Sequence, residues 1–115
     1  MDSILNSTKK LLSLDSTYTP FDTDITILIN SSFSVLAQIG VLTDSGFSIT
    51  NSQQVWSSLN VSPMLLNMIK TYVFLKVKYS FDPPATSFLL DAVKSEIKEY
   101  ESRLMMLKEY QDAQI

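Results

Sequence analysis

The amino-acid sequence predicts a mainly α fold: a small bundle of about four helices with a long C-terminal helix and a short insertion between the second and third helices. Apolar residues recur at helical spacing in four segments. A serine followed by a proline begins one of these segments, and "DPP" separates it from the last. With 115 residues the chain can form one core but not two, so we expect a single domain over residues 1–115.

The first helix is expected from about Ser3 to Leu14, with Asp2 or Ser3 available as its N-cap. The turn-rich segment "DSTYTP" then separates it from the second helix. Its apolar residues are expected to share one buried face: Ile4, Leu5, Leu11 and Leu12.

The second helix should begin near Asp22 and end before Gly40, because glycine is common just after the end of a helix. One stripe should face the core: Ile25, Leu28, Ile29, Ser32, Val35, Leu36 and Ile39. The opposite face is polar without being charged, and it consists of Asn30, Ser31, Ser34 and Gln38.

The insertion that follows carries two short apolar pairs around "TNSQQ". Phe47 and Ile49 precede this turn-like sequence, and Val55 and Trp56 follow it. The pattern fits a short β-hairpin, or a loop that is held by one aromatic anchor. Phe47 and Trp56 would also suit a small satellite core beneath a long loop, so both interpretations stay open.

The third helix should begin with Ser62 as N-cap and Pro63 in the first turn. The segment from Pro63 to Phe81 also alternates in its second half as a strand would, but its length and its proline-led start favour a helix. Because it is apolar almost all round, we expect it to be the central, most buried helix. It should end at Asp82, where two prolines follow.

The last helix is expected from about Ser87 to Tyr110. We expect its apolar seam to pack against the chain's own third helix, and an intermolecular coiled coil is the alternative. Glu99 and Arg103 form a favourable i, i+4 pair outside the seam. The seam repeats every three or four residues: Leu90, Val93, Ile97, Tyr100, Leu104 and Leu107.

Composition excludes most catalytic chemistry. The chain has no cysteine and no histidine, which removes disulfides, thiol nucleophiles, Cys/His zinc sites and imidazole-based triads. Two glycines in all leave no Gly-rich phosphate loop, and Asp22 and Asp24 suit a helix N-terminus. We therefore expect no enzyme, no cofactor and no metal site. A net charge of −3 also argues against dedicated nucleic-acid binding.

Two segments could suggest targeting or membrane insertion. The N-terminus places an acid at position 2 and two lysines within its apolar run, unlike a signal peptide. The uncharged run from Ile25 to Thr43 is interrupted by polar residues at helical spacing, unlike a membrane span. We therefore expect no membrane association.

The distribution of charge is uneven, because Asp44 is the only acid or base between Ile25 and Ile69. Interface cores are depleted in charged residues, since an ion is costly to bury unless it is paired. Chance use of Ser, Asn, Gln and Thr on a solvated surface is the alternative. We predict a protein interface that includes Ser34, Gln38, Phe47, Ile49, Val55 and Trp56. Because an isolated hairpin is marginal, we also expect residues 43–59 to be ordered only in an assembly, with Trp56 as the anchor.

Three quoted segments carry a family resemblance: "DSILNSTKKLLSLDSTYTPFDTDITILIN", "FSITNSQQVW" and "TYVFLKVKYSFDPPATSFLLDAVKSEIKEYESRL". They resemble the small head-tail connector proteins of tailed bacteriophages, also called adaptor or head-completion proteins. The most specific element is "FDPP" followed by "SFLLDA" and a charged amphipathic helix. The family has no catalytic motif, so no site residue is carried over.

The resemblance implies a structural virion protein that is made and assembled in the host cytoplasm and located in the neck. It implies a ring between the portal protein and the next neck or tail component, with about 12 copies by analogy with the portal. DNA would pass through the lumen without sequence-specific binding. A small helical regulator or scaffold that binds a partner protein is the alternative, and a DNA-binding module is a third. Co-assembly with a portal and retention on heparin distinguish the three.

Overall fold

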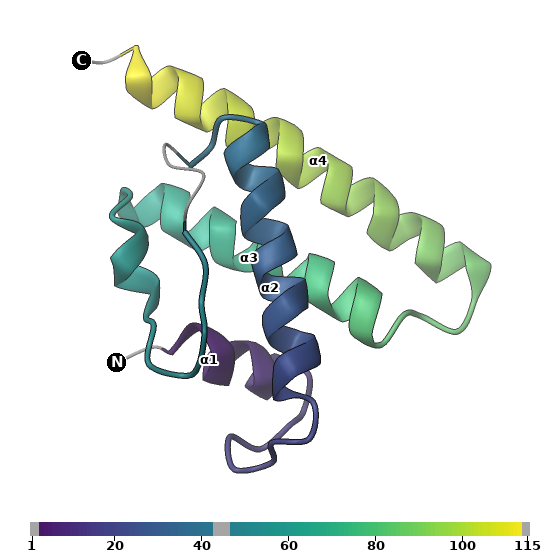
Figure 1. The fold of residues 1–115 in the computed structure, drawn as a ribbon. Helices are drawn as coiled ribbons and strands as arrows, with labels where there is room; N and C mark the ends of the chain where they lie inside the picture. Colours follow the sequence, from purple (N-terminus) through teal and green to yellow (C-terminus); the bar gives the residue numbers. More distant parts are fainter. Residues whose placement is uncertain (1–2, 43–46, 114–115) are drawn as a thin grey trace.

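The structure is a computed structural model that describes residues 3–42 and 47–113. Its elements are α1 (Ile4–Leu11), α2 (Asp22–Gln38), a short 3₁₀ helix η1 (Trp56–Leu59), α3 (Pro63–Phe81) and α4 (Ser87–Asp112). Helix α3 lies at the centre, where α2 crosses it and α4 runs back along it, while α1 contacts both α2 and α3 (Figure 1). The predicted mainly α fold with a long C-terminal helix is confirmed.

Helix α1 begins as predicted but ends earlier. The Ser3 hydroxyl caps it by accepting a hydrogen bond from the Asn6 N–H at 3.1 Å, whereas Asp2 lies outside the described residues. After Leu11 the chain turns at Ser13, which has a left-handed φ of 64°. The Ser13 N–H then donates to the Lys10 carbonyl at 3.0 Å, and the Leu14 N–H donates to the Lys9 carbonyl at 2.8 Å. Glycine usually occupies such a position, so the serine gave no signal that the helix ends here.

The buried face of α1 also differs from the prediction. Thr8 and Lys9 are buried beside Ile4 and Leu5, while Leu11 is 55% exposed. The Lys9 amino group lies 2.7 Å from the Asp22 carboxylate and 3.1 Å from the Ser16 carbonyl oxygen. Because a buried charge is costly without partners, this arrangement fixes α1 to the start of α2. An apolar pattern cannot identify a lysine as a core residue.

Helix α2 matches its predicted limits. Gly40 has a φ of 84°, its N–H donates to the Ala37 carbonyl at 3.1 Å, and the Val41 N–H donates to the Leu36 carbonyl at 2.9 Å. This pattern closes a helix at a left-handed residue. Phe33, which the predicted stripe omitted, is buried with Ile25, Ile29, Ser32 and Leu36.

The insertion is a loop with one 3₁₀ turn, so the predicted β-hairpin is wrong for the described residues and the loop alternative holds. The Ile49 N–H and carbonyl both bond to the Asn30 side-chain amide, at 2.8 and 2.9 Å. Val55 forms an isolated β-bridge with Ser3 instead of with the other half of the insertion. The two expected strands therefore pair with other parts of the chain and not with each other.

Helices α3 and α4 follow their predictions closely. The Ser62 hydroxyl accepts the Leu65 N–H at 3.3 Å, Pro63 opens α3, and the helix ends at Phe81. The core-facing residues of α3 are fully buried: Leu65, Ile69, Tyr72, Val73 and Val77. No helix in residues 3–42 and 47–113 is long and apolar enough to cross a membrane.

The seam of α4 packs within the chain, which confirms intramolecular packing. Ile97 and Leu104 are buried in the core, and Val93, Tyr100 and Leu107 pack against it. The predicted pair is present, with the Arg103 guanidinium 3.3 Å from the Glu99 carboxylate. The Tyr72 hydroxyl donates to the Glu101 carboxylate at 2.7 Å, and burial together with this carboxylate raises the pKa of Tyr72. This contact joins α3 to α4.

Candidate functional site

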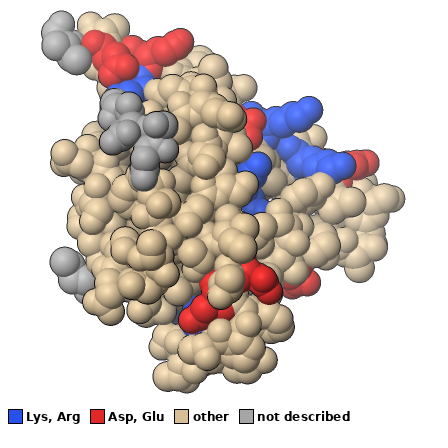
Figure 2. Space-filling view, viewed as in Figure 1, with Lys and Arg blue, Asp and Glu red and all other residues tan. Residues whose placement is uncertain are grey.

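Beyond its first turn, where Asp24 is exposed, the outward side of α2 is a polar surface without charge. Five exposed or nearly exposed residues follow one another at helical spacing there, and we call them the α2 face: Thr23, Ile27, Ser31, Ser34 and Gln38. Ile27 is 60% exposed. Figure 2 shows charged side chains toward the right, the bottom and the upper left of this view, with a broad uncharged area between them. The α2 face therefore combines an exposed apolar residue with small polar ones.

The six residues predicted for an interface fall into three groups. Ser34 and Gln38 are exposed on the α2 face. Phe47 and Val55 are half-buried. Ile49 and Trp56 are each only 2% exposed and belong to the core. The structure brings together only Ser34 and Gln38 on one open surface.

Trp56, which the sequence offered either as an interface anchor or as a core residue beneath the loop, is buried. Its indole N–H donates to the Ser7 hydroxyl at 2.9 Å. Its ring meets those of Phe33 and Phe74 edge to face, with centroids 6.2 and 5.8 Å apart. The open alternative, a core role beneath the loop, is what the structure shows. This one side chain joins the insertion to α1, α2 and α3.

Much of the uncharged sequence has a cause within the chain. Asn30 bonds to both backbone groups of Ile49, which a carboxylate without an N–H donor could not do. The Gln54 side-chain oxygen accepts the N–H groups of Thr50 and Asn51, each at 3.1 Å. The Asn51 side chain in turn accepts the Gln53 N–H at 2.8 Å. These amides shape residues 49–54, whereas the side chains of the α2 face remain exposed. Asp44 lies outside the described residues.

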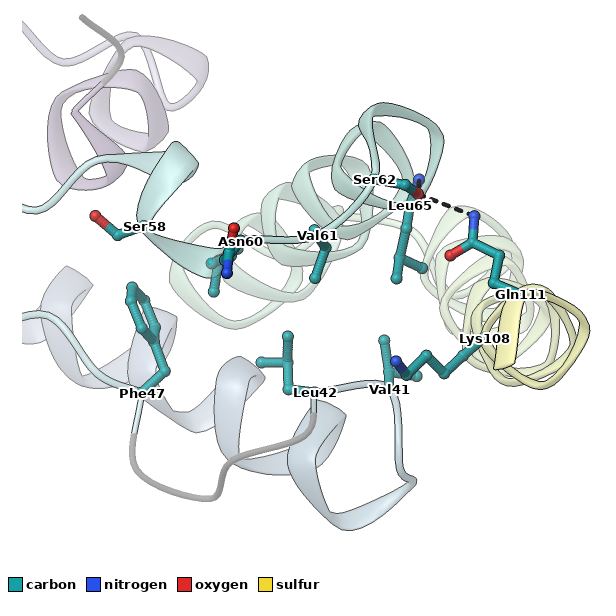
Figure 3. A pocket seen from close by; sticks show the side chains of 11 residues that line it. Val41, Leu42, Phe47, Ser58, Asn60, Val61, Ser62, Leu65, Lys108 and Gln111 are labelled. Carbon is teal, nitrogen blue, oxygen red and sulfur yellow. Dashed lines mark hydrogen bonds between the residues drawn. The ribbon is translucent and has the colours of Figure 1, made fainter. Parts of the chain in front are cut away.

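A second feature is a hollow of about 520 Å³ at the C-terminal end of α4 (Figure 3). Its walls come from the segment after α2, from residues 58–62 and from α4. Across its rim the Gln111 side-chain N–H donates to the Ser62 hydroxyl at 2.9 Å. The Lys108 amino group is 3.2 Å from the Asp112 carboxylate. We call this cavity the C-terminal hollow. Its lining is mixed, with six apolar residues, Val41, Leu42, Phe47, Leu59, Val61 and Leu65, and five polar or charged ones, Ser58, Asn60, Ser62, Lys108 and Gln111.

Among the described residues, no three or more Asp or Glu side chains gather so as to hold a metal ion. The described part of the chain has an uncharged helix face and a hollow of mixed lining on a small helical bundle. A surface without charge is typical of the cores of protein interfaces.

The chain belongs to the phage connector protein family, whose model matches residues 4–111. No curated protein and no solved structure matches the chain. The connector family is structural and not enzymatic, and membership implies a structural role in the virion, at the head-tail junction. The family resemblance inferred from the quoted segments is thereby confirmed.

Proposed function

We propose that copies of this chain form a ring between the portal protein and the next neck or tail component, and that the ring extends the DNA channel. Family membership supports the location at the head-tail junction. The uncharged α2 face is the observation that supports a contact with another virion component. A ring subunit must present more than one surface, since a heterologous contact uses a different patch on each partner. We retain about 12 copies by analogy with the portal.

The α2 face is suited to docking against a component above or below the ring. Its serine and glutamine side chains keep hydrogen-bonding capacity at little desolvation cost, whereas a buried unpaired ion costs several kcal/mol. Burial of Ile27, which is now 60% exposed, adds a favourable apolar term of about 1–2 kcal/mol. The portal protein is the partner that we assign to this surface.

The ring would surround DNA without reading its sequence. The net charge of −3 gives no excess of cations to neutralise phosphates along the duplex. We therefore expect weak retention on heparin at physiological salt. Strong retention would favour the DNA-binding alternative.

Charge insertion on the α2 face tests the proposal. Ser34→Lys and Gln38→Glu should leave the melting temperature of the free chain unchanged, because both side chains are exposed. Each should weaken docking to the portal at least about tenfold, because a new ion must be desolvated. Ser102→Lys, at an exposed site on α4, is the matched control. Binding to purified portal by sedimentation and by electron microscopy gives the measurement.

Two outcomes would count against this function. Normal docking of both variants would remove the α2 face from the contact. Absence of ring particles with the unaltered chain and portal would refute the ring itself, and tight one-to-one binding to a different protein would favour the regulator or scaffold.

A further inference from the structure

A groove between the second half of α3 and the facing part of α4 carries a group of lysines. Lys76 comes from α3, whereas Lys94 and Lys98 come from α4. The groove has a volume of about 600 Å³, and we call it the lysine groove. Figure 2 shows Lys and Arg side chains gathered toward the right of this view, where Figure 1 places α4 and the end of α3.

The three lysines have no carboxylate partner. Lys94 and Lys98 are exposed, and neither forms an ion pair within residues 3–42 and 47–113. Lys76 is half-buried, with its amino group 6.0 Å from the centroid of the Tyr72 ring. Since like charges one helical turn apart repel each other, the spacing of Lys94 and Lys98 disfavours the free helix. Four other cations, by contrast, lie close to a carboxylate: Lys9 to Asp22, Lys78 to Asp82, Arg103 to Glu99 and Lys108 to Asp112.

Two carboxylates also border the lysine groove, but they do not cancel its charge. Asp91 is exposed, and the Glu101 carboxylate accepts the Tyr72 hydroxyl at 2.7 Å. Three lysines against these two acids leave the groove positive, although the whole chain has a net charge of −3. Ser80 and Ser95 add hydroxyl donors to the same lining. Ammonium and hydroxyl donors without bound acceptors are suited to an anionic partner that carries several charges.

We propose that the lysine groove contacts the phosphate backbone of the DNA that passes through the ring. The inference rests on the ring proposed above and assigns to it the surface that faces the channel. Lys94 and Lys98 lie about 6 Å apart along the axis of α4, close to the distance between neighbouring phosphates of one strand. No residue of α2 lines the groove, so the α2 face stays free for the portal. Phosphate contacts carry no sequence information, as a channel for a whole genome requires.

One copy should bind DNA only weakly. Its groove offers three cations on an acidic chain, which agrees with the weak heparin retention expected above. A ring brings the grooves of all its copies to one duplex, so the weak contacts act together. Electrostatic contacts of this kind also allow a duplex to slide along the protein.

The free chain allows the contact to be tested without a ring. Binding of a short DNA duplex is measured by NMR titration from about 50 to 200 mM salt. Lys94→Gln combined with Lys98→Gln should weaken binding about tenfold or more at the lower salt, and should reduce the slope of log K against log salt by about two, because two phosphate contacts are lost. The unfolding transition should stay unchanged, since both side chains are exposed.

Lys10→Gln combined with Arg103→Gln is the matched control, because it removes the same charge at two exposed sites outside the groove. Equal DNA affinity of the two double variants would overturn the inference. Tighter binding of polyglutamate than of DNA would also overturn it, and would assign the groove to an acidic protein surface. If rings form with portal but their DNA binding does not depend on the groove lysines, the contact is refuted while the ring survives. Groove-dependent DNA binding without closed rings would support the contact and refute only the ring.

Discussion

At the scale of single residues, the uncharged polar side chains of this chain have two different roles. Asn30 and Gln54 are uncharged because their amides must both donate and accept within the fold. Ser34 and Gln38 are uncharged on an open surface, where a charge would be tolerated in the free chain. The sequence pattern could not separate these groups, since the partners of Asn30 lie 19 residues away. Only the second group supports an interface.

Trp56 illustrates the consequence for stability. Trp56→Ala should destabilise the free chain by about 3–5 kcal/mol, because it empties a core site between Phe33 and Phe74 and leaves the Ser7 hydroxyl without its donor. Urea unfolding followed by circular dichroism measures the change. Ser57→Ala, at the exposed neighbouring site, is the control and should stay within about 0.5 kcal/mol. An unaltered midpoint in Trp56→Ala would return this residue to an interface role.

At the scale of elements, the predictions succeeded where local signals and packing agree. Ser62, Pro63 and the "DPP" turn gave the limits of α3, and the seam of α4 gave its buried face. The end of α1 was missed because Ser13 takes a left-handed conformation without being glycine. The hairpin was wrongly predicted because strand partners are tertiary contacts: the Ile49 backbone bonds to the Asn30 side chain, and Val55 forms its β-bridge with Ser3. The periodicity of a segment does not identify the distant residues that hydrogen-bond to its backbone.

The seam supplies the element-scale prediction. Ile97→Asp should destabilise the chain by more than about 3 kcal/mol, because a carboxylate would be buried without a cation in the α3–α4 contact. Thermal unfolding should then show a large fall in melting temperature or no cooperative transition. Ser95→Asp, two residues earlier on an exposed site, should unfold like the unaltered chain. Equal melting temperatures for the two variants would mean that the seam faces outward.

At the scale of the whole molecule, the described residues form three regions with different roles around α3. The core side fixes α1, α2 and α4, the α2 face is left open, and the C-terminal hollow lies at the end of α4. The molecule is flat, with principal extents of 44 × 36 × 20 Å, so much of its area lies on broad faces. Little of this division could be predicted from sequence, because the lining of the hollow comes from parts of the chain that are distant in sequence: Val41, Leu42, Phe47, residues 58–62, Leu65, Lys108 and Gln111.

Amide hydrogen exchange separates folding from assembly across the whole chain. We expect the Ile49 and Ile4 amides to be protected in the free protein, because they donate to the Asn30 side chain at 2.8 Å and to the Gln54 carbonyl at 3.0 Å. Neither bond requires a second copy. Free exchange of the Ile49 amide until the ring formed would mean that assembly orders the insertion. The Asn30–Ile49 hydrogen bonds would then result from that ordering and would not cause it.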